Sequence, residues 1–233
     1  MQTVSFQSIQ AKAPVLKSHV PLKIVVLGDS LVYGYGDPEG GGWVERLRRQ
    51  GLDPDRSGPI FYNLGVRGDT VVQTAQRFEA ELKQRGEIRH RIPDRLILSV
   101  GVNDSARVGH GAGRHRTDFA EFQAILAQLL DRAMHLCPTL FIGMIPVNQQ
   151  KMPFLDAFYF NHEDQFLYKE VTQLACQERQ VPYLDTFERW RHRGQHWCNT
   201  HLCHDGLHPN TQGYQALLAD IVGWEPYQNA IAC

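Results

Sequence analysis

The stretch Ile24-Val25-Val26-Leu27-Gly28-Asp29-Ser30-Leu31 decides the fold of this 233-residue chain. A short apolar run that stops at a glycine predicts a buried strand ending in a turn, and a fully apolar strand is typical of a parallel sheet covered by helices on both faces. In such sheets ligands bind beyond the carboxyl ends of the strands. Ser30 directly follows this strand and is the first candidate for a reactive side chain, although Ser also commonly caps a turn or a helix there.

Apolar runs bounded by turn residues recur along the chain, and segments with helical spacing separate them. Strands are expected at residues 24–28, 60–64, 96–100, 141–147 and 181–185. Helices are expected at residues 43–51, 70–86, 117–138 and 156–180, and a last one from Asn210 or Thr211. This alternation predicts the α/β class, as a three-layer α/β/α sandwich with a five-stranded parallel sheet and right-handed crossovers.

Two of the expected helices begin with a capping signal. Thr70-Val71-Val72-Gln73 resembles a capping box, in which the Thr and Gln side chains satisfy free backbone donors. Thr117 is the expected cap of the next helix, whose apolar residues recur at helical spacing up to Pro138. The strand expected at residues 60–64 and the helix expected at residues 70–86 therefore repeat the strand-turn-helix order of the N-terminal stretch.

The composition is that of an ordinary globular protein, with 42% hydrophobic and 21% charged residues. A chain of this length can bury one good core, so we expect a single domain at residues 21–233 after an N-terminal extension at residues 1–20. The formal net charge of −1 gives no attraction to nucleic acid or to an anionic membrane. No span reaches about 18 apolar residues, so no stable membrane insertion is expected.

The N-terminus and the cysteines indicate the compartment. Residues 1–20 lack the basic start, long apolar segment and small-residue cleavage site of a secretory signal. Five cysteines are an odd number and are mostly scattered, unlike the disulfide framework of a secreted protein. The chain is therefore expected to be cytoplasmic, and its sequence gives no indication of oligomeric state.

An acid and an imidazole stand close together in Asp205-Gly206-Leu207-His208-Pro209, just before the last expected helix. Hydrolysis by a nucleophilic Ser needs a base, a group that orients the base, and donors for the developing oxyanion. Pro209 restricts His208 to extended backbone angles, and the positive end of the helix favours the neutral imidazole that a base needs. A lone His before a Pro is otherwise a common loop feature.

Four blocks of sequence resemble a known family. They are Gly28-Asp29-Ser30-Leu31, Asn63-Leu64-Gly65-Val66-Arg67-Gly68-Asp69-Thr70, Gly101-Val102-Asn103-Asp104 and Asp205-Gly206-Leu207-His208-Pro209. In this order and with these separations they resemble the SGNH hydrolases, also called the GDSL esterases and lipases, over nearly the whole chain after about Lys23. The resemblance implies a flavodoxin-like sheet and hydrolysis of acyl esters without a metal or other cofactor.

The same resemblance assigns roles to individual residues. Ser30 would be the nucleophile, His208 the general base and then acid, and Asp205 the partner that orients it. The backbone N–H groups of Ser30 and Gly65 and the side-chain amide of Asn103 would form the oxyanion hole. Gly65 suits this role because no Cβ keeps a substrate from its N–H, and Asn103 offers an uncharged donor. Asn103 and the Asp that follows it are otherwise a common turn pair.

Two other enzyme classes are disfavoured by spacing. The Gly-x-Ser-x-Gly elbow of the α/β-hydrolases requires Gly at position 32, where this chain has Val32. A phosphate-binding loop requires Gly-Lys-Ser or Gly-Lys-Thr after the strand, and neither follows it here.

The roles of three further groups of residues are not decided by the sequence. Cys198, His201, Cys203 and His204 have metal-ligand side chains without a paired Cys-x-x-Cys arrangement, and Cys198 and Cys203 could also form a disulfide. The alternative is a surface loop that positions the side chains of Asp205 and His208.

The loop Ser105–Arg116, rich in Gly and Arg, is either a solvated connection or a wall that contacts an acidic or polar substrate. Five apolar residues are core, a subunit contact or the lining of an acyl pocket: Phe154, Leu155, Phe158, Tyr159 and Phe160.

The expected function is a serine esterase or lipase-like hydrolase that cleaves small-molecule carboxylic esters through an acyl-enzyme. Removal of acyl groups from a carbohydrate, thioester cleavage and lysophospholipid cleavage are alternatives within the same chemistry. A binding protein that keeps the fold without catalysis is the alternative from a different class.

Overall fold

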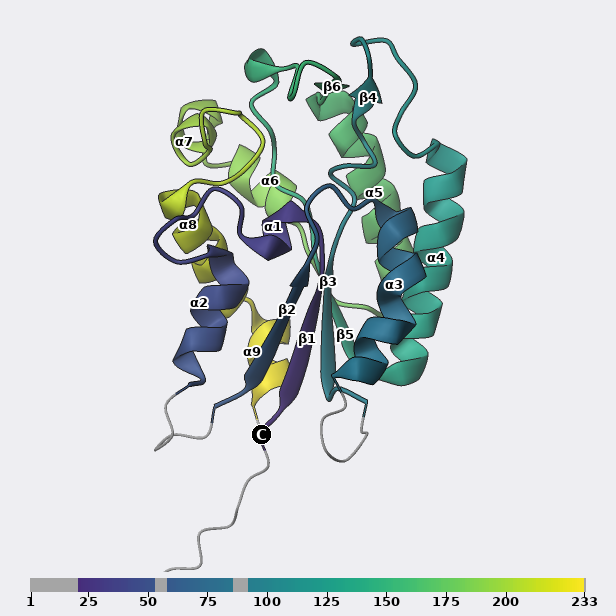
Figure 1. Cartoon of the computed structure of the whole chain (residues 1–233), viewed down its shortest axis with the longest axis vertical. Coiled ribbons are helices and arrows are strands. Elements are labelled where there is room, and N and C mark those ends of the chain that lie inside the picture. The colour runs from purple at the N-terminus through teal and green to yellow at the C-terminus, as the bar shows by residue number, and fades with distance from the viewer. Residues whose placement is uncertain (1–20, 53–57, 86–91, 233) are drawn as a thin grey trace, which may run out of the picture.

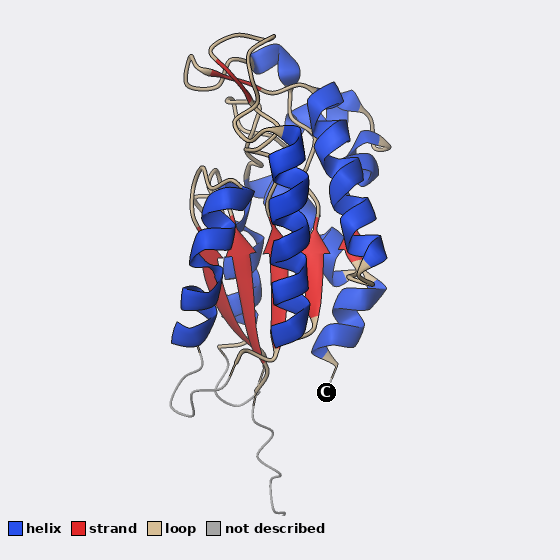
Figure 2. Ribbon diagram, turned by 90° about the vertical axis from the view of Figure 1, so that its right-hand side faces the viewer, coloured by secondary structure: helices blue, strands red, loops and turns tan. Residues whose placement is uncertain are grey.

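The computed structural model describes residues 21–52, 58–85 and 92–232. Five strands form a parallel sheet in the order β2-β1-β3-β5-β7: β1 (Lys23–Gly28), β2 (Ile60–Gly65), β3 (Arg95–Ser99), β5 (Thr139–Ile142) and β7 (Tyr183–Leu184). Helices cover both faces of this sheet, so the predicted three-layer α/β/α sandwich is confirmed (Figure 1, Figure 2). The expected N-terminal extension at residues 1–20 lies outside the described residues.

The helices form two layers of different make-up. One face of the sheet carries three long helices that pack side by side: α3 (Val71–Gln84), α4 (Phe119–Leu136) and α5 (His162–Glu178). The other face carries α2 (Gly42–Gln50), α8 (Thr211–Val222) and α9 (Glu225–Ile231) (Figure 1). Shorter helices lie in the connections: α1 (Ser30–Tyr33), η2 (Gln149–Lys151), α6 (Thr186–Arg191) and α7 (Gln195–Thr200).

The order of the strands reverses at β1. This strand pairs with β2 along its whole length and with β3 from Ile24 to Gly28, and all its residues are buried, as its apolar pattern predicts. The connection from β1 to β2 runs through α2 on one face, and the connection from β2 to β3 runs through α3 on the other. A reversal of this kind opens a crevice at the carboxyl ends of the strands. Ser30 follows β1 at that crevice.

The strand expected at residues 141–147 is shorter and begins earlier. It is β5, Thr139–Ile142, and only Phe141 and Ile142 pair with the outer strand β7. β7 itself has two residues, so the chain beyond Ile142 has no strand on that side with which to continue the ladder. Pro146 also removes a backbone donor from the remaining apolar run.

The helix expected at residues 156–180 begins only at His162, where Asn161 caps it. The aromatic residues before it form strand β6 (Phe158–Tyr159), which pairs antiparallel with β4 (Arg107–Val108). This two-stranded ribbon lies beyond the carboxyl ends of the main sheet (Figure 1). Residues that the sequence places on a helix therefore stand over the crevice.

The two capping signals have different outcomes. The capping box of α3 is present, and the Thr70 N–H donates to Gln73 Oε1 at 2.9 Å. The expected cap Thr117 is wrong, because Asp118 caps α4 and accepts a hydrogen bond from the Ala120 N–H at 2.9 Å. The Thr117 hydroxyl instead donates to the buried carboxyl group of Asp104 at 2.6 Å.

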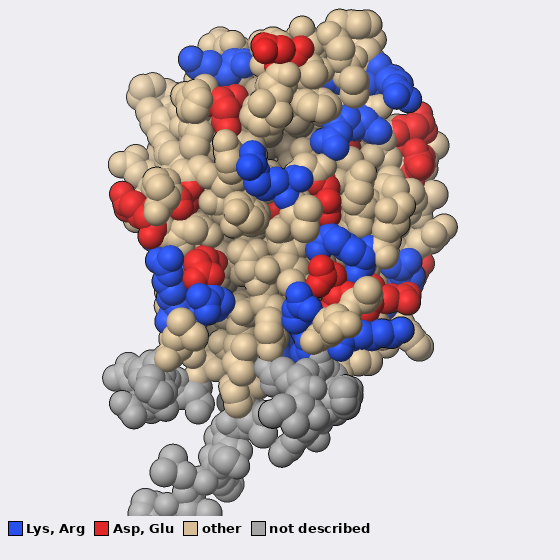
Figure 3. Space-filling view, in the orientation of Figure 1, with Lys and Arg blue, Asp and Glu red and all other residues tan. Residues whose placement is uncertain are grey.

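Polar and apolar side chains are separated as in other globular proteins. The largest fully buried side chains include Trp43, Trp190, Tyr168 and Tyr214. Positive and negative side chains are interspersed on the face shown in Figure 3, in keeping with a net charge of −1. Within the described ranges, no helix is both long and apolar enough to cross a bilayer.

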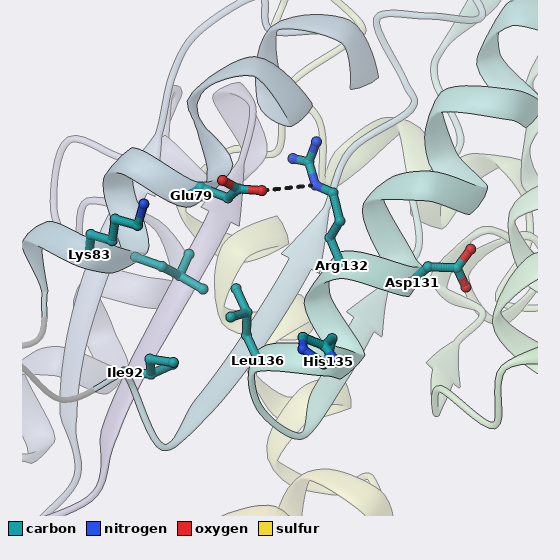
Figure 4. Close-up of a pocket in the computed structure, with 8 residues that line it drawn as sticks. Glu79, Lys83, Ile92, Asp131, Arg132, His135 and Leu136 are labelled. Atoms are coloured by element: carbon teal, nitrogen blue, oxygen red, sulfur yellow. Dashed lines mark ion pairs between the residues drawn. The ribbon is translucent and has the colours of Figure 1, made fainter.

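A cavity of about 640 Å³ lies between the C-terminal halves of α3 and α4, near the amino ends of the strands. Glu79 and Arg132 approach each other across it at 3.7 Å, and Leu136 and Ile92 line it (Figure 4). Its lining contains no Ser, Thr or Cys that could act as a nucleophile.

Candidate active site

Ser30 lies where the chain turns from β1 into α1. The turn forms because Asp29 caps the helix, and its carboxyl group accepts a hydrogen bond from the Leu31 N–H at 2.9 Å. The helix ends after one turn at Gly34, whose φ of 89° is in the left-handed region that glycine adopts without strain. Ser30 is thus held at the first position of a very short helix, where it is 4% exposed.

The Ser30 hydroxyl is hydrogen-bonded to an imidazole. Ser30 Oγ and His208 Nε2 are 2.9 Å apart, and His208 Nδ1 is 2.7 Å from Asp205 Oδ2. A carboxylate at Nδ1 retains the ring proton there, which leaves Nε2 free to accept the proton of the serine. The structure brings together the three residues to which the motif resemblance gives catalytic roles.

Asp205 is fixed by the backbone as well as by His208. Its Oδ1 accepts hydrogen bonds from the N–H groups of Leu207 at 2.9 Å and of His208 at 3.0 Å. Burial opposes ionisation, but the hydrogen bonds from the His208 ring and from these two N–H groups outweigh it and hold the pKa of Asp205 below its usual value. Asp205 is therefore ionised at neutral pH and is suited to orient the ring and stabilise an imidazolium.

Two aromatic side chains confine the imidazole. The ring of Tyr35 lies 4.6 Å from that of His208, centroid to centroid, and the ring of Phe154 lies 5.6 Å from it, both edge-on. The backbone carbonyl of His208 accepts a hydrogen bond from the Cys203 N–H at 2.7 Å. These contacts restrict rotation of the ring, so that Nε2 stays directed at the serine.

Asn103 follows β3 and lines the same pocket as Ser30. Its Nδ2 donates to the carbonyl of Asp69 at 3.0 Å and lies 3.4 Å from Asp29 Oδ2, while its Oδ1 lies 3.4 Å from Arg116 Nη1. Acceptors at one end and a donor at the other fix the orientation of the amide. The N–H of Ser30 is a second candidate donor, because the first residue of a helix has no intrahelical acceptor.

Gly65, the third expected donor, does not line this pocket. Its N–H donates to Asn63 Oδ1 at 3.1 Å, and a Cβ at this position would come within 2.1 Å of the Tyr33 nitrogen. Gly68 does line the Ser30 pocket, has a φ of 82°, and its N–H has no hydrogen-bond acceptor in the part of the chain that the structure describes. Gly68 therefore replaces Gly65 as the candidate third donor of the oxyanion hole.

The pocket at Ser30 has a volume of about 300 Å³. Four of the five residues that the sequence offers for an acyl pocket line it: Phe154, Leu155, Phe158 and Phe160. Tyr159 does not, because neighbouring residues of strand β6 point to opposite sides. Leu207 and two arginines, Arg67 and Arg116, complete the lining together with the catalytic candidates.

Sequence comparison identifies the family to which this arrangement of motifs belongs. The model of the GDSL-like Lipase/Acylhydrolase family matches residues 26–216, which is most of the chain. The chain belongs to the GDSL-like lipase/acylhydrolase family. Membership supports the hydrolysis of esters. No curated protein has a sequence that matches this one.

Solved structures of other proteins share the fold of this GDSL-family chain. A lipase/acylhydrolase from Enterococcus faecalis is 21% identical with a TM-score of 0.68, over 87% of this chain and 94% of that one. The psychrotrophic esterase EstA from Pseudoalteromonas sp. is 18% identical with a TM-score of 0.64, over 89% and 98%. The acetylxylan esterase Axe2 from Geobacillus stearothermophilus is 18% identical with a TM-score of 0.64, over 87% and 93%.

The cysteine and histidine stretch of this GDSL-family chain packs against its neighbours. Cys198 and Cys203 are free thiols, and Cys198 Sγ is 3.1 Å from the carbonyl oxygen of Trp190. His201 stacks on Trp197 with a centroid distance of 3.7 Å. Within residues 21–52, 58–85 and 92–232, no group of three His, Cys, Asp or Glu side chains could hold a metal ion.

The loop Ser105–Arg116 is in part a connection and in part a pocket wall. Arg107 is ion-paired with Asp164 at 2.5 Å, which ties strand β4 to the start of α5. Arg114 is exposed and does not line the pocket, whereas Arg116 does. Of the three arginines in this loop, only Arg116 lines the pocket at Ser30.

Three buried acids lie beside the oxyanion donors. Burial raises the pKa of Asp29 to about 7 against the hydrogen bond from the Leu31 N–H, and raises the pKa of Asp104 to about 6. Both oxygens of Asp104 lie 3.1 Å from the Val71 nitrogen, which joins the turn after β3 to the start of α3. Asp69 is ion-paired with Arg77 at 2.7 Å. These contacts fix the loops that carry Asn103 and Gly68.

Replacement of Asn103 by Ala is expected to lower kcat by about 10²–10³-fold, because one donor to the developing oxyanion is lost. KM for a neutral ester should change little, since the charge develops mainly in the transition state. Steady-state kinetics on a nitrophenyl ester measure both values. A loss that appears in KM alone would contradict this role for the amide.

The two glycines of the second motif block are expected to differ in their response to Ala. Gly65→Ala should lower the free energy of unfolding by more than about 2 kcal/mol, because its Cβ would meet the Tyr33 nitrogen at 2.1 Å. Gly68→Ala should lower it by only about 1 kcal/mol, because nothing lies within 4 Å of that Cβ and the left-handed φ is its sole strain. Urea denaturation of both variants measures the difference, and equal losses would contradict this placement of Gly65.

Proposed function

We propose that this GDSL-family chain is a serine esterase that hydrolyses small-molecule carboxylic esters through an acyl-enzyme intermediate on Ser30. The observation that carries the proposal is the continuous chain of hydrogen bonds from Ser30 Oγ to His208 at 2.9 Å and from His208 to Asp205 at 2.7 Å. A serine that only caps a helix needs no base, and a histidine in a loop needs no carboxylate.

In the first half of the proposed reaction, Ser30 Oγ attacks the ester carbonyl while His208 Nε2 accepts its proton. Asp205 stabilises the imidazolium that results. The negative charge on the former carbonyl oxygen is held by the N–H groups of Ser30 and Gly68 and by the Asn103 amide. The tetrahedral intermediate then expels the alcohol, which takes the proton from His208.

In the second half, water attacks the acyl-enzyme. His208 Nε2 accepts a proton from this water, and the same three donors hold the charge of the second tetrahedral intermediate. Ser30 leaves with the proton from His208, and the carboxylic acid is released. The reaction therefore consumes one ester and one water and requires no other reactant.

The size of the pocket favours short acyl groups. A volume of about 300 Å³ is at the small end of the range of about 300–1,000 Å³ that is typical of ligand sites. Three phenylalanines from β6 and the residues next to it line the pocket: Phe154, Phe158 and Phe160. A long acyl chain would have to extend over the exposed surface, where it gains little from burial.

We expect kcat/KM for nitrophenyl acetate or butyrate to exceed that for the palmitate by at least about 10-fold. The test is a series of nitrophenyl esters from acetate to palmitate, with an acetylated sugar and an acyl thioester as further substrates. Activity that rises steadily with chain length would indicate a lipase and contradict the proposed short-acyl preference. A folded protein that is inactive on every member would contradict the esterase proposal itself.

A further inference from the structure

Two arginines without a carboxylate partner line the pocket of Ser30. Arg67 precedes the candidate donor Gly68, and Arg116 is the last residue of the loop that follows Asn103. Among the described residues, neither forms an ion pair with an Asp or a Glu. Other arginines of the chain are paired with aspartates, as in Arg46–Asp37, Arg77–Asp69, Arg107–Asp164, Arg179–Asp131 and Arg193–Asp220.

Arg116 is half-buried and held in place by neutral acceptors. Its Nη2 donates to the Gly68 carbonyl at 2.9 Å, its Nη1 lies 3.4 Å from Asn103 Oδ1, and its guanidinium lies 5.1 Å from the ring centroid of Phe158. A guanidinium has five N–H donors, and these contacts use two of them. The remaining donors are available to a ligand.

Three acids interact electrostatically with Arg116, and each of them already accepts hydrogen bonds or forms an ion pair with another group. They are Asp104, Asp29 and Asp69. Asp104 accepts from the Thr117 hydroxyl and a backbone N–H, Asp29 accepts from the Leu31 N–H, and Asp69 is paired with Arg77. Burial lowers the pKa of Arg116, and the charges of these acids offset part of that effect. Among the described residues, none of the three forms a direct ion pair with Arg116.

Arg67 is exposed and stacked rather than hydrogen-bonded. Its guanidinium lies 3.9 Å from the ring centroid of Tyr35, the same ring that packs against His208. Stacking occupies one face of the planar group and leaves its N–H edges free, which is the geometry that suits recognition of a carboxylate or a phosphate. In the described part of the chain, no acceptor for the Arg67 N–H groups is present.

We propose that the substrate of this site is an ester that carries a second, anionic oxygen group, a carboxylate or a phosphate, which Arg67 and Arg116 bind while Ser30 attacks the ester carbonyl. This inference rests on the proposed esterase function. Both arginines adjoin the candidate oxyanion donors, so an anion that they bind lies within the small pocket and close to the reacting carbonyl. The anion belongs to either the acyl part or the alcohol part of the ester.

Two pairs of matched esters test the inference and distinguish the two parts. In 4-acetoxybenzoate and 4-acetoxybenzamide, a carboxylate on the alcohol part is replaced by a neutral carboxamide of similar size. The monomethyl ester of succinate and methyl succinamate make the same replacement on the acyl part. We expect kcat/KM of the wild-type protein to be about 10-fold or more higher for the anionic member of at least one pair. This ratio should fall as NaCl is raised, because one of the arginines is exposed.

Variants at Arg67 and at a control arginine test whether the pocket causes the ratio of kcat/KM for the anionic ester to kcat/KM for the neutral ester. Arg67→Gln should reduce the anionic-to-neutral ratio about 10-fold, and Arg67→Lys should retain more of it because the charge remains. Arg114→Gln removes an exposed arginine that does not line the pocket and should keep the wild-type ratio. Circular dichroism and thermal unfolding of the three variants check that each is folded.

The outcomes separate this inference from the function on which it rests. Hydrolysis of neutral esters that depends on Ser30, with equal kcat/KM for both members of each pair, would overturn the anionic substrate and leave the esterase standing. An Arg67→Gln variant that keeps the wild-type ratio would also overturn it. Absence of hydrolysis of all four esters, together with failure of a phosphonate to modify Ser30, would overturn the esterase and this inference with it.

Discussion

Replacement of Ser30 by Ala is expected to lower kcat for any ester that the wild-type protein hydrolyses by about 10⁴–10⁶-fold. Without Oγ there is no atom to form the acyl-enzyme, and the base His208 has no hydroxyl to activate. Ser30 packs in the first turn of α1, and among the described residues its Oγ bonds only to His208, so the fold should survive the change. The measurement is the initial rate of nitrophenyl acetate hydrolysis, with thermal unfolding of both proteins.

A matched control for Ser30→Ala is Ser99→Ala. Ser99 is also a buried serine, at the end of the neighbouring strand β3, but it does not line the pocket at Ser30. Its replacement should change the rate by less than about 2-fold, because Ser99 does not line the pocket in which Ser30 and His208 lie. Equal activity of Ser30→Ala and the wild-type protein would remove Ser30 from the mechanism.

Replacement of Asp205 by Asn is expected to lower kcat by about 10³–10⁴-fold with little change in KM. The amide can keep its oxygen at the backbone N–H groups of Leu207 and His208, so the loop should hold its shape. The NH₂ group then faces His208 Nδ1 and donates to it. The ring proton moves to Nε2, which can no longer accept the proton of Ser30.

The comparison with Asp205→Ala separates orientation of the ring from support of the loop. The Ala variant also lacks the acceptor for the N–H groups of Leu207 and His208. The free energy of unfolding of the Ala variant should therefore be about 1–3 kcal/mol lower than that of the Asn variant. Steady-state kinetics and urea denaturation of the two variants supply the data. An Asn variant with wild-type kcat would show that Asp205 does not set the tautomer of His208.

Much of the fold could be predicted from the sequence because its strands are buried on both faces. The apolar runs that begin at Ile24, Ile60 and Leu96 are strands in the structure, and their order along the chain leaves few arrangements for a parallel sheet. The β5 boundary was missed because the apolar run continues to Val147 after the partner strand has ended. Apolar patterns indicate burial, and residues 143–147 are buried although they form no strand. Only the Gly143 N–H still donates to the carbonyl of Leu184 in β7, at 2.9 Å.

The candidate catalytic residues could be found because each stands in a short motif with few possible roles. The candidate donor in the second motif block could not be chosen from the sequence, because the block contains two glycines and only the loop conformation decides which one lines the pocket. The positive φ of Gly68 and its place just before the capped helix α3 mark a turn at this position. Spacing alone gave no such distinction from Gly65.

The residues that line the pocket could not all be predicted from local sequence patterns, because contacts between distant segments place them there. Phe158 was expected in the helix at residues 156–180, yet an antiparallel pairing between residues 107–108 and 158–159 carries it over the crevice. Arg116 reaches the pocket because β4 and its partner fold the loop back across Asn103. Pairing between distant segments decides such features, and it follows from the tertiary structure rather than from propensity.

The most direct test of the proposed mechanism is mass spectrometry of the protein after reaction with a nitrophenyl alkylphosphonate, which traps an activated serine as a stable covalent adduct. We expect one adduct per chain on the peptide that contains Ser30, no adduct on Ser30→Ala, and slow formation on Asp205→Asn. An adduct on another residue, or undiminished labelling of the Ser30→Ala variant, would contradict the assignment of Ser30 as the nucleophile.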